Sequence, residues 1–286
     1  MENKNFLSPK EIAEYTVESG LKKTLLSPVK MIILGILAGV FIAFASEGSN
    51  MAAFNLWASP DTYGLGKVLA GAIFGTGLML VVIAGGELFT GNTLIIMSVL
   101  QRKAKFSGMM KNWSLVYIGN FIGSFFIAYM IVHSGQLNAS GALLGATTIK
   151  IASYKVSLSF MEAFYLGIMC NWLVCLAVWM AYGAKDMIGK LMAIFFPIWL
   201  FITSGFEHSV ANMYYIPAGI LAKANPVYYE AAINAGVSAE KMNALNWGSF
   251  ITHNLIPVTI GNIVGGGVLV GMVYWFVYLT NKKKAM

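Results

Sequence analysis

The stretch Gly85–Asn92 (GGELFTGN) decides the fold, because it places a carboxylate, a threonine and three glycines in the middle of an apolar run. That run extends from Val68 to Leu100 and would reach roughly 50 Å as one helix, whereas a bilayer core is roughly 30 Å thick. A second apolar run, Ile188 to Leu221, is interrupted in the same way by Ser204–Ser209 (SGFEHS). We therefore expect two broken helices in an integral membrane protein.

The composition supports this interpretation. Of 286 residues, 58% are hydrophobic and only 11% are charged, against about 25% charged in soluble domains. Such a composition excludes a disordered chain, a disulfide scaffold and a nucleic-acid-binding domain. The sequence predicts an all-α membrane protein with six transmembrane helices, in which helices 2 and 5 are broken. The membrane domain would span residues 29–280, between an N-terminal segment (1–28) and a basic tail (281–286). The four unbroken spans are Val29–Ser46, Trp113–Val132, Ser159–Tyr182 and Leu255–Leu279.

The distribution of basic residues predicts that both termini lie in the cytoplasm, since cytoplasmic loops carry an excess of lysine and arginine. With six spans, the terminal side holds most of them, including Lys22, Lys23, Arg102, Lys103, Lys105, Lys282, Lys283 and Lys284. The opposite side holds Lys67, Lys150, Lys155, Lys223 and Lys241. A signal peptide ending at Ala43–Ala45 is the alternative, but the polar segment before it is far longer than a normal n-region.

The N-terminal segment carries a helix start signal. Ser8–Glu11 has the form of a capping box with proline at the first helical position, and Ala13, Val17 and Leu21 recur at a spacing of four. We expect an amphipathic cytoplasmic helix over Pro9–Leu25. Its role is either that of an interfacial anchor or that of a plug for whatever opens inside the membrane domain.

The two halves of the chain resemble each other. Each contains an intact span, a broken span and an intact span, and an odd number of spans forces the second half to enter the membrane from the opposite side. This predicts an inverted 3+3 repeat with an aquaporin-like protomer architecture and a pathway between the halves, near the midplane. The paired segments are Glu87–Asn92 with Glu207–Asn212, Val116–Gly123 with Val258–Gly265, and Leu34–Ile36 with Leu166–Ile168.

Glu87, Glu207 and His208 lie in the two breaks, and ionisable residues at membrane depth are functional candidates. Each glutamate has a structural alternative, which is to accept hydrogen bonds from the N–H groups of the following half-helix. His208 differs because Leu88 occupies its position in the first half. Histidine changes charge between pH 5 and 8, so it could pair with an anion or pass it a proton, with the Thr90 hydroxyl facing it.

Two further features accompany the breaks. The pairs Gly119-Asn120 and Gly261-Asn262 suit close helix approach and hydrogen bonds across helices, which is a structural role. Lys155 lies just outside the fourth span. It is either a solvated loop lysine or a cation that attracts anions to a pore mouth.

The segments Gly86–Thr90, Gly205–Met213 and Asn254–Asn262 resemble the signatures of the formate/nitrite transporter family, and within it the formate channels. The similarity extends over nearly the whole chain after residue 10. It implies a homopentamer of six-helix protomers in a bacterial cytoplasmic membrane, each with its own pore, and it places His208 between two apolar constrictions. Glu87 is a departure, because the formate channels have aspartate there.

The resemblance also implies the roles of particular residues. The cytoplasmic constriction corresponds to Leu78 and Val174, and the periplasmic one to Phe74, Leu88 and Phe201, with Phe89 as a further constriction residue. Thr90 corresponds to the threonine of the loop that faces the histidine. The polar network behind the pore corresponds to Lys155, Glu207, Asn262 and Asn171.

The expected function is a pore for small monovalent anions, formate first, with nitrite, hydrosulfide, acetate or lactate as alternatives. Apolar rings exclude hydrated ions, whereas a weak acid crosses them once His208 neutralises it; channel-like and strictly proton-coupled transport both stay open. An aquaporin-type channel would need two Asn-Pro-Ala motifs, and only Asn225-Pro226 occurs, followed by valine. An intramembrane enzyme is a distant alternative, since the chain has no His-Glu-x-x-His motif. No metal, cofactor or nucleic-acid partner is expected.

Overall fold

A computed structural model describes residues 5–280, and these residues are almost entirely helical. Within them the only β-type pairing is one isolated bridge between Phe6 and Ala184. By length and composition, six helices of this part of the chain could cross a membrane: Pro28–Ala53, Pro60–Gly85, Phe106–His133, Phe160–Gly183, Met187–Ser204 and Trp247–Leu279. The predicted all-helical architecture with apolar helices is confirmed, whereas the predicted tail at 281–286 lies outside the described residues.

The helices follow one another with short connections. The first half contains α1 (Pro9–Leu25), α2 (Pro28–Ala53), α3 (Pro60–Leu80), the π-helical turn η2 (Val81–Gly85), α4 (Phe89–Asn92), η3 (Thr93–Ile95), α5 (Ile96–Leu100) and α6 (Phe106–His133). The second half contains α7 (Ala139–Val156), α8 (Phe160–Gly183), α9 (Met187–Ser204), α10 (Ser209–Ala222), α11 (Pro226–Asn234), α12 (Ala239–Ala244), α13 (Trp247–Ser249), η5 (Phe250–Leu255), α14 (Ile256–Asn262), η6 (Ile263–Met272) and α15 (Val273–Leu279). The 3-10 turns η1 (Leu56–Ala58) and η4 (Gln136–Asn138) complete the chain.

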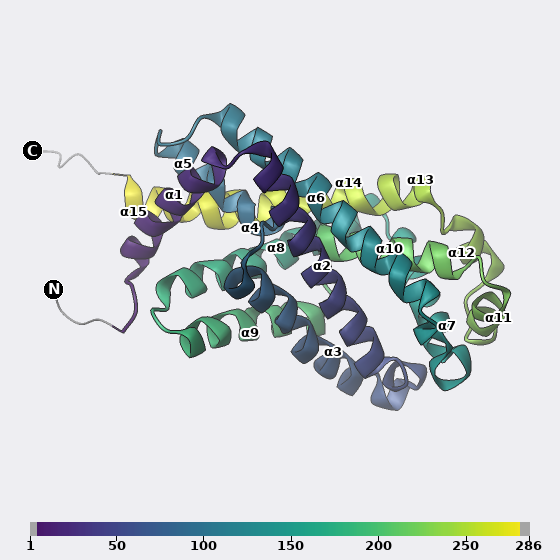
Figure 1. The fold of residues 1–286 in the computed structure, drawn as a ribbon. Helices are drawn as coiled ribbons and strands as arrows, with labels where there is room; N and C mark the ends of the chain where they lie inside the picture. The colour runs from purple at the N-terminus through teal and green to yellow at the C-terminus, as the bar shows by residue number, and fades with distance from the viewer. Residues whose placement is uncertain (1–4, 281–286) are drawn as a thin grey trace, which may run out of the picture.

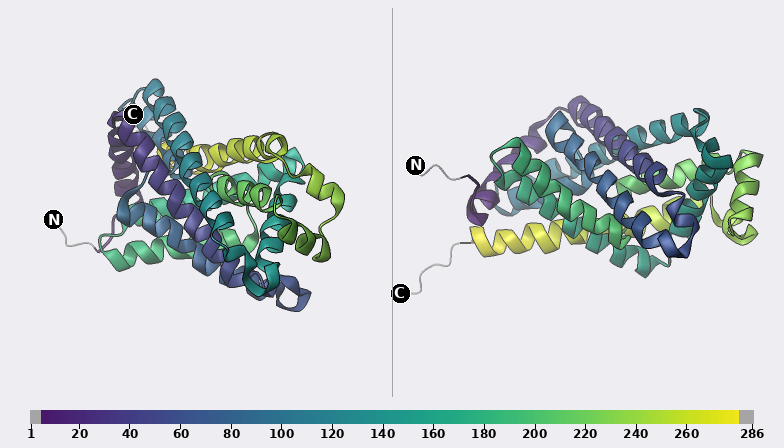
Figure 2. Two further views of the ribbon diagram at one scale, coloured as in Figure 1. Left: turned by 45° about the vertical axis from the view of Figure 1, so that its right-hand side comes forward. Right: turned by 90° about the horizontal axis from the view of Figure 1, so that it is seen from below.

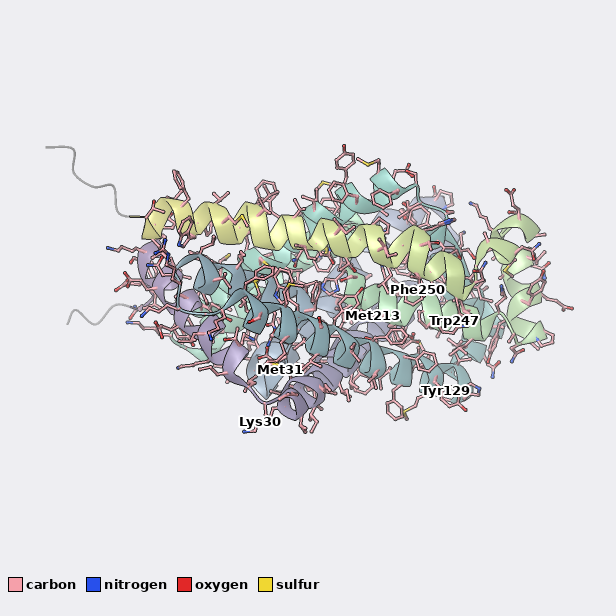
Figure 3. The ribbon with its side chains drawn as sticks, turned by 90° about the horizontal axis from the view of Figure 1, so that it is seen from above. Lys30, Met31, Tyr129, Met213, Trp247 and Phe250 are labelled. Carbon is pink, nitrogen blue, oxygen red and sulfur yellow. The ribbon has the colours of Figure 1, made fainter. Side chains whose placement is uncertain are left out.

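The molecule is elongated (Figures 1 and 2). Helices α1, α5 and α15 gather at one end, and α7, α11, α12 and α13 lie at the other. We call these the α1 end and the α7 end. Between them, the long helices run side by side, and the side chains of Trp247 and Phe250 lie near the α7 end of the last long helix (Figure 3).

Local sequence sets where the helices begin. The predicted capping box of α1 is present, with the Ser8 N–H donating to Glu11 Oε2 at 2.7 Å. Ser159 and Glu162 form a second capping box at the start of α8. The first span was predicted to end at Ser46, but α2 continues to Ala53. It continues because polar residues of this last part, such as Glu47, are buried against neighbouring helices rather than exposed.

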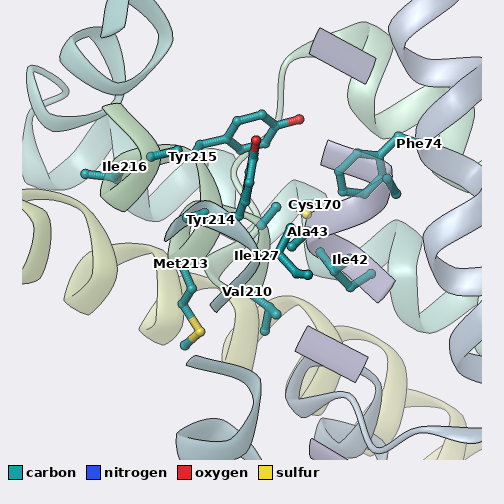
Figure 4. Packing of buried hydrophobic residues seen from close by; sticks show 14 of the residues in the cluster. Ile42, Ala43, Phe74, Ile127, Cys170, Val210, Met213, Tyr214, Tyr215 and Ile216 are labelled. Atoms are coloured by element: carbon teal, nitrogen blue, oxygen red, sulfur yellow. The ribbon is translucent and has the colours of Figure 1, made fainter. Parts of the chain in front are cut away.

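Glycines let pairs of helices approach until their backbones touch. A Cβ added at Gly39 or Gly123 would overlap a backbone carbonyl between α2 and α6, and one added at Gly265 would overlap the carbonyl of Ile168 between α8 and the last span. Close approach brings asparagine side chains within reach of the facing backbone. In the centre, α10 packs on α6, α7 and α2, and Val210 and Tyr214 lie near Ile42 and Cys170 (Figure 4).

Candidate functional site

The first polar cluster surrounds Glu87, which is buried in the extended segment between η2 and α4. Its Oε1 lies 2.7 Å from Lys23 Nζ of α1, and its Oε2 accepts a hydrogen bond from Asn92 Nδ2 at 2.7 Å. Asn92 also donates to Asn112 Oδ1, and Asn112 donates in turn to the backbone carbonyl of Lys23. The four residues close a ring that ties α1 to the segment before α4.

The second polar cluster repeats the first around Glu207, which precedes α10. Glu207 Oε1 lies 2.7 Å from Lys155 Nζ of α7, and its Oε2 accepts from Asn212 Nδ2 at 2.6 Å. Asn212 donates to Asn254 Oδ1, and Asn254 donates to the backbone carbonyl of Lys155 at 2.9 Å. The contacts match those of the first cluster, with α7 in the place of α1.

Two buried asparagines hold the backbone of the two extended segments. Asn120 Nδ2 donates to the carbonyls of Gly35 and Glu87, and its Oδ1 accepts from the Phe89 N–H at 2.9 Å. Asn262 makes the same three contacts in the second half, with the carbonyls of Gly167 and Glu207 and the N–H of Ser209. Each asparagine therefore supplies hydrogen-bond partners to the backbone of one extended segment and ties that segment to a neighbouring helix.

His208 lies where the two extended segments meet. Its Nε2 is 2.9 Å from Thr90 Oγ1, and its Nδ1 accepts a hydrogen bond from the N–H of Ala211 at 3.0 Å. Because Nδ1 is an acceptor, the neutral ring carries its proton on Nε2. His208 is 3% exposed and Thr90 is fully buried, so the structure brings the two predicted site residues together away from bulk water.

Asn171 of α8 connects α4 to α14. Its Nδ2 donates to the carbonyl of Thr90 at 3.1 Å and to the carbonyl of Asn262 at 2.6 Å. The thiol of Cys175, one turn further along α8, donates to the same Thr90 carbonyl at 3.4 Å. These contacts fix the backbone of Thr90 and therefore the direction of its hydroxyl.

Aromatic residues cover His208 on one side. The rings of Phe74 and Phe201 meet edge to face with centroids 5.6 Å apart, and the Phe201 ring lies 6.1 Å from the His208 ring. Both phenylalanines are almost fully buried. Phe89 is placed differently, because its ring packs against Trp113 and Tyr117 of α6.

A cavity of about 400 Å³ opens at the α1 end and reaches toward the centre. Its polar lining includes Lys22, Lys23 and Glu87, while Leu78 and Leu88 belong to its apolar wall. Val174, the remaining predicted constriction residue, is buried on α8 one turn from Val178, which lines the same cavity.

Lys23 has a role that was not predicted from the sequence. Burial alone would lower the pKa of this lysine, but the Glu87 carboxylate raises it, and the net result is a raised pKa. The ammonium therefore stays charged at neutral pH. A signal was present in the sequence: if the alignment of Leu34–Ile36 with Leu166–Ile168 is continued toward the N-terminus, Lys23 falls opposite Lys155.

Glu47 of α2 is a second residue that was missed. It is 4% exposed, and its Oε2 accepts a hydrogen bond from the Tyr214 hydroxyl. Its Oε1 and both polar atoms of Asn50 have no hydrogen-bond partner among the described residues. Glu47 lies in the polar stretch Ser46–Asn50, just after the predicted end of the first span, so no pattern in the sequence distinguishes it from a loop residue.

Within residues 5–280, no group of three or more histidine, cysteine, aspartate or glutamate side chains is arranged to hold a metal ion. Cys170 and Cys175 are both buried and free. The polar groups near the centre are instead a histidine, a threonine, asparagine side-chain amides and two lysine–glutamate pairs. Such groups can hold a small anion by hydrogen bonds, or exchange a proton with it at His208.

Comparison with known proteins gives a consistent result. The model of the family described as formate/nitrite transporter matches residues 10–276. The formate channel FocA of Escherichia coli (strain K12) is 38% identical over 277 residues, which cover 96% of this chain and 95% of FocA. A probable formate transporter of Methanothermobacter thermautotrophicus is 40% identical over 87% of this chain and 89% of its own. A solved structure of a pentameric formate channel with formate bound superposes with a TM-score of 0.78 at 40% identity, covering 88% of this chain and 98% of that one. These relatives are channels and transporters, not enzymes, as predicted.

Proposed function

The chain belongs to the formate/nitrite transporter family, and from this premise we propose that it is a membrane channel for small monovalent anions, with formate as its main substrate. The relatives that bear the name formate channel support the choice of formate. Nitrite, hydrosulfide, acetate and lactate are the competing substrates, because each is a small anion of a weak acid. The pentameric assembly of the similar solved structure supports a homopentamer for this chain as well.

The protomer is an inverted 3+3 repeat in which the second and fifth spans are broken. The matched contacts around Glu87 and Glu207 support this architecture, as does the same arrangement of Asn120 and Asn262. Under this arrangement α1 and α7 are counterparts, each of which supplies a lysine to a glutamate. The proposed location is a bacterial cell membrane, and the excess of basic residues on the terminal side supports a cytoplasmic position for the α1 end.

The pathway passes His208 between two apolar constrictions. Leu78, on the wall of the cavity at the α1 end, supports a constriction on the cytoplasmic side, to which Val174 also belongs. Leu88, which the family resemblance assigns to the periplasmic constriction, lines the same cavity. Phe74 and Phe201 form the constriction on the other side of His208. Phe89 is left out of this proposal, because its ring packs against α6 instead.

His208 and Thr90 select the anion and carry the proton step. The neutral ring holds its Nε2 proton toward Thr90 Oγ1, so an anion that arrives between the constrictions finds both donors there. A neutral imidazole is too weak an acid to protonate formate, and proton transfer therefore requires an imidazolium. That form needs a proton on Nδ1, which must first release the N–H of Ala211. Proton coupling thus includes a small movement at the start of α10.

Lys155 acts through Glu207 rather than as a solvated lysine. Its side chain is 12% exposed and its ammonium is held by the carboxylate. Glu207, Asn262 and Asn171 then fix the backbone around His208 and Thr90. The network thereby keeps both hydrogen-bond donors of the pathway in place.

The contact between His208 and Thr90 is the observation that carries this proposal. The test is anion uptake into proteoliposomes that contain the wild-type chain or the Thr90→Val variant, which keeps the shape of the side chain but removes the donor. Formate uptake should fall at least tenfold in the variant while the protein stays folded. Uptake equal to that of the wild type would place the pathway elsewhere.

A further inference from the structure

Neither lysine of the two polar clusters offers a free charge to an anion. The Nζ atoms of Lys23 and Lys155 each lie 2.7 Å from a glutamate oxygen. At several ångströms from such an ion pair the two opposite charges largely cancel, so the pair attracts an anion only weakly. The attraction between opposite charges falls with distance and with the dielectric constant. An anion approaching the α7 end therefore needs another cation to draw it in.

Lys67 lies on the face of α3 that leads to the proposed constriction. Residues seven apart in an α-helix share a face, and Lys67 precedes Phe74 by seven positions. Two helical turns place it about 10 Å further from the centre than Phe74. Gly71 lies between them on the same face and packs on Trp199 of α9.

The head of Lys67 is held at the end of α9 without an ionic partner. Its Nζ lies 3.5 Å from the position where a Cβ of Gly205 would stand, and 5.7 Å from the centre of the Tyr63 ring. It interacts electrostatically with Glu207 and Lys155. Among the hydrogen bonds and ion pairs of residues 5–280, none involves the Lys67 ammonium, so its charge is not neutralised by a carboxylate in direct contact.

We propose that Lys67 is the cation that concentrates the anion at the mouth of the α7 end, before the anion reaches Phe74 and Phe201. This inference rests on the proposed function as an anion channel. Gly205, at φ 76°, has no side chain and leaves the space over the end of α9 to the lysine head. Lys67 then acts as a positioning residue for entry, and Lys155 supports the backbone behind it.

The competing role for Lys67 is structural. Lysines near the last turn of a helix stabilise its free carbonyls, and α9 ends beside the Lys67 head. If Lys67 only caps α9, its replacement would lower the stability of the protein, and the effect would be the same at every salt concentration. A recruiting lysine would affect flux according to ionic strength, because the Debye length falls from about 30 Å at 0.01 M salt to about 3 Å at 1 M.

The experiment measures initial formate uptake into proteoliposomes across a salt series for Lys67→Gln, Lys67→Arg and the control Lys150→Gln. Lys150 is an exposed lysine of α7, so its variant removes the same charge from the same end. We expect Lys67→Gln to lower uptake on the order of tenfold at 0.01 M salt and by less than twofold at 1 M. Lys67→Arg and Lys150→Gln should behave like the wild type.

Two outcomes would overturn this inference. Uptake by Lys67→Gln that equals the wild type at every salt concentration would leave Lys67 without a role in entry. A loss of uptake that is the same at every salt concentration, together with a lower unfolding midpoint, would assign Lys67 to the end of α9. Failure of the wild type itself to take up formate would instead refute the proposed function, which keeps the two failures distinct.

Discussion

Replacing Lys155 by methionine removes the only ammonium in direct contact with the buried Glu207 carboxylate among the described residues. The carboxylate is 2% exposed and keeps only its hydrogen bonds from Asn212 and Asn254. Breaking a buried ion pair by removing one partner costs about 3–5 kcal/mol. The two remaining hydrogen bonds favour the lower end, so we expect a loss of about 3 kcal/mol, or roughly a hundredfold in the folding equilibrium constant.

The measurement is the free energy of unfolding in detergent micelles for Lys155→Met, Glu207→Gln and the double variant. The double variant should recover at least half of the loss, because the glutamine oxygen still accepts from Asn212 while no charge stays buried. Lys23→Met is the matched control at the other end. Its pair is more exposed, at 22% and 9% against 12% and 2%, so its loss should be smaller.

A loss below about 1 kcal/mol for Lys155→Met would contradict this reasoning, since that is the range of exposed ion pairs. Additive effects of Lys155→Met and Glu207→Gln in the double variant would contradict it as well. Either result would mean that the carboxylate of Glu207 is not stabilised by Lys155. The lysine would then have to act on the anion directly.

Three further outcomes are expected. His208→Asn should preserve folding, because asparagine is also a good helix N-cap, and it should abolish the pH dependence of formate uptake; unchanged pH dependence would exclude a proton relay at this residue. Phe201→Ala should let lactate pass several-fold faster relative to formate, and an unaltered ratio in flux assays would place the constriction elsewhere. Gly265→Ala should lower the unfolding free energy by about 1–3 kcal/mol, because its Cβ would overlap the carbonyl of Ile168. Gly64→Ala should not lower the unfolding free energy, because a Cβ at Gly64 meets no atom within 4 Å. Equal effects of the two substitutions would refute the close packing at Gly265.

The sequence was sufficient to predict an all-helical fold with apolar helices, because hydropathy and helix start signals are local. The apolar spans and the capping box at Ser8 could be predicted without knowledge of the packing. The ends of the spans could not be predicted in this way. α2 continues beyond Ser46 because Tyr214, far away in the chain, donates a hydrogen bond to Glu47 and allows it to be buried.

The candidate site was predictable where its residues lie in the internal repeat of the sequence. The repeat in the sequence identified Glu87, Glu207 and the unmatched His208 as the residues to examine. The pairing of Lys23 with Glu87 needs the fold, because α1 was assigned to an anchor or plug and not to the polar cluster. The different placement of Phe89 also follows from packing, since its backbone N–H is held by Asn120 while its ring turns to α6.

The most direct test of the central claim is anion flux into proteoliposomes that contain the purified wild-type chain. Formate, nitrite, acetate and lactate are compared at pH 5 and pH 7, with protein-free liposomes and the Thr90→Val variant as controls. The proposal predicts formate flux well above that of protein-free liposomes at both pH values, faster than lactate, and lost in the variant. Formate flux no greater than that of protein-free liposomes, from protein that is folded and inserted, would contradict it.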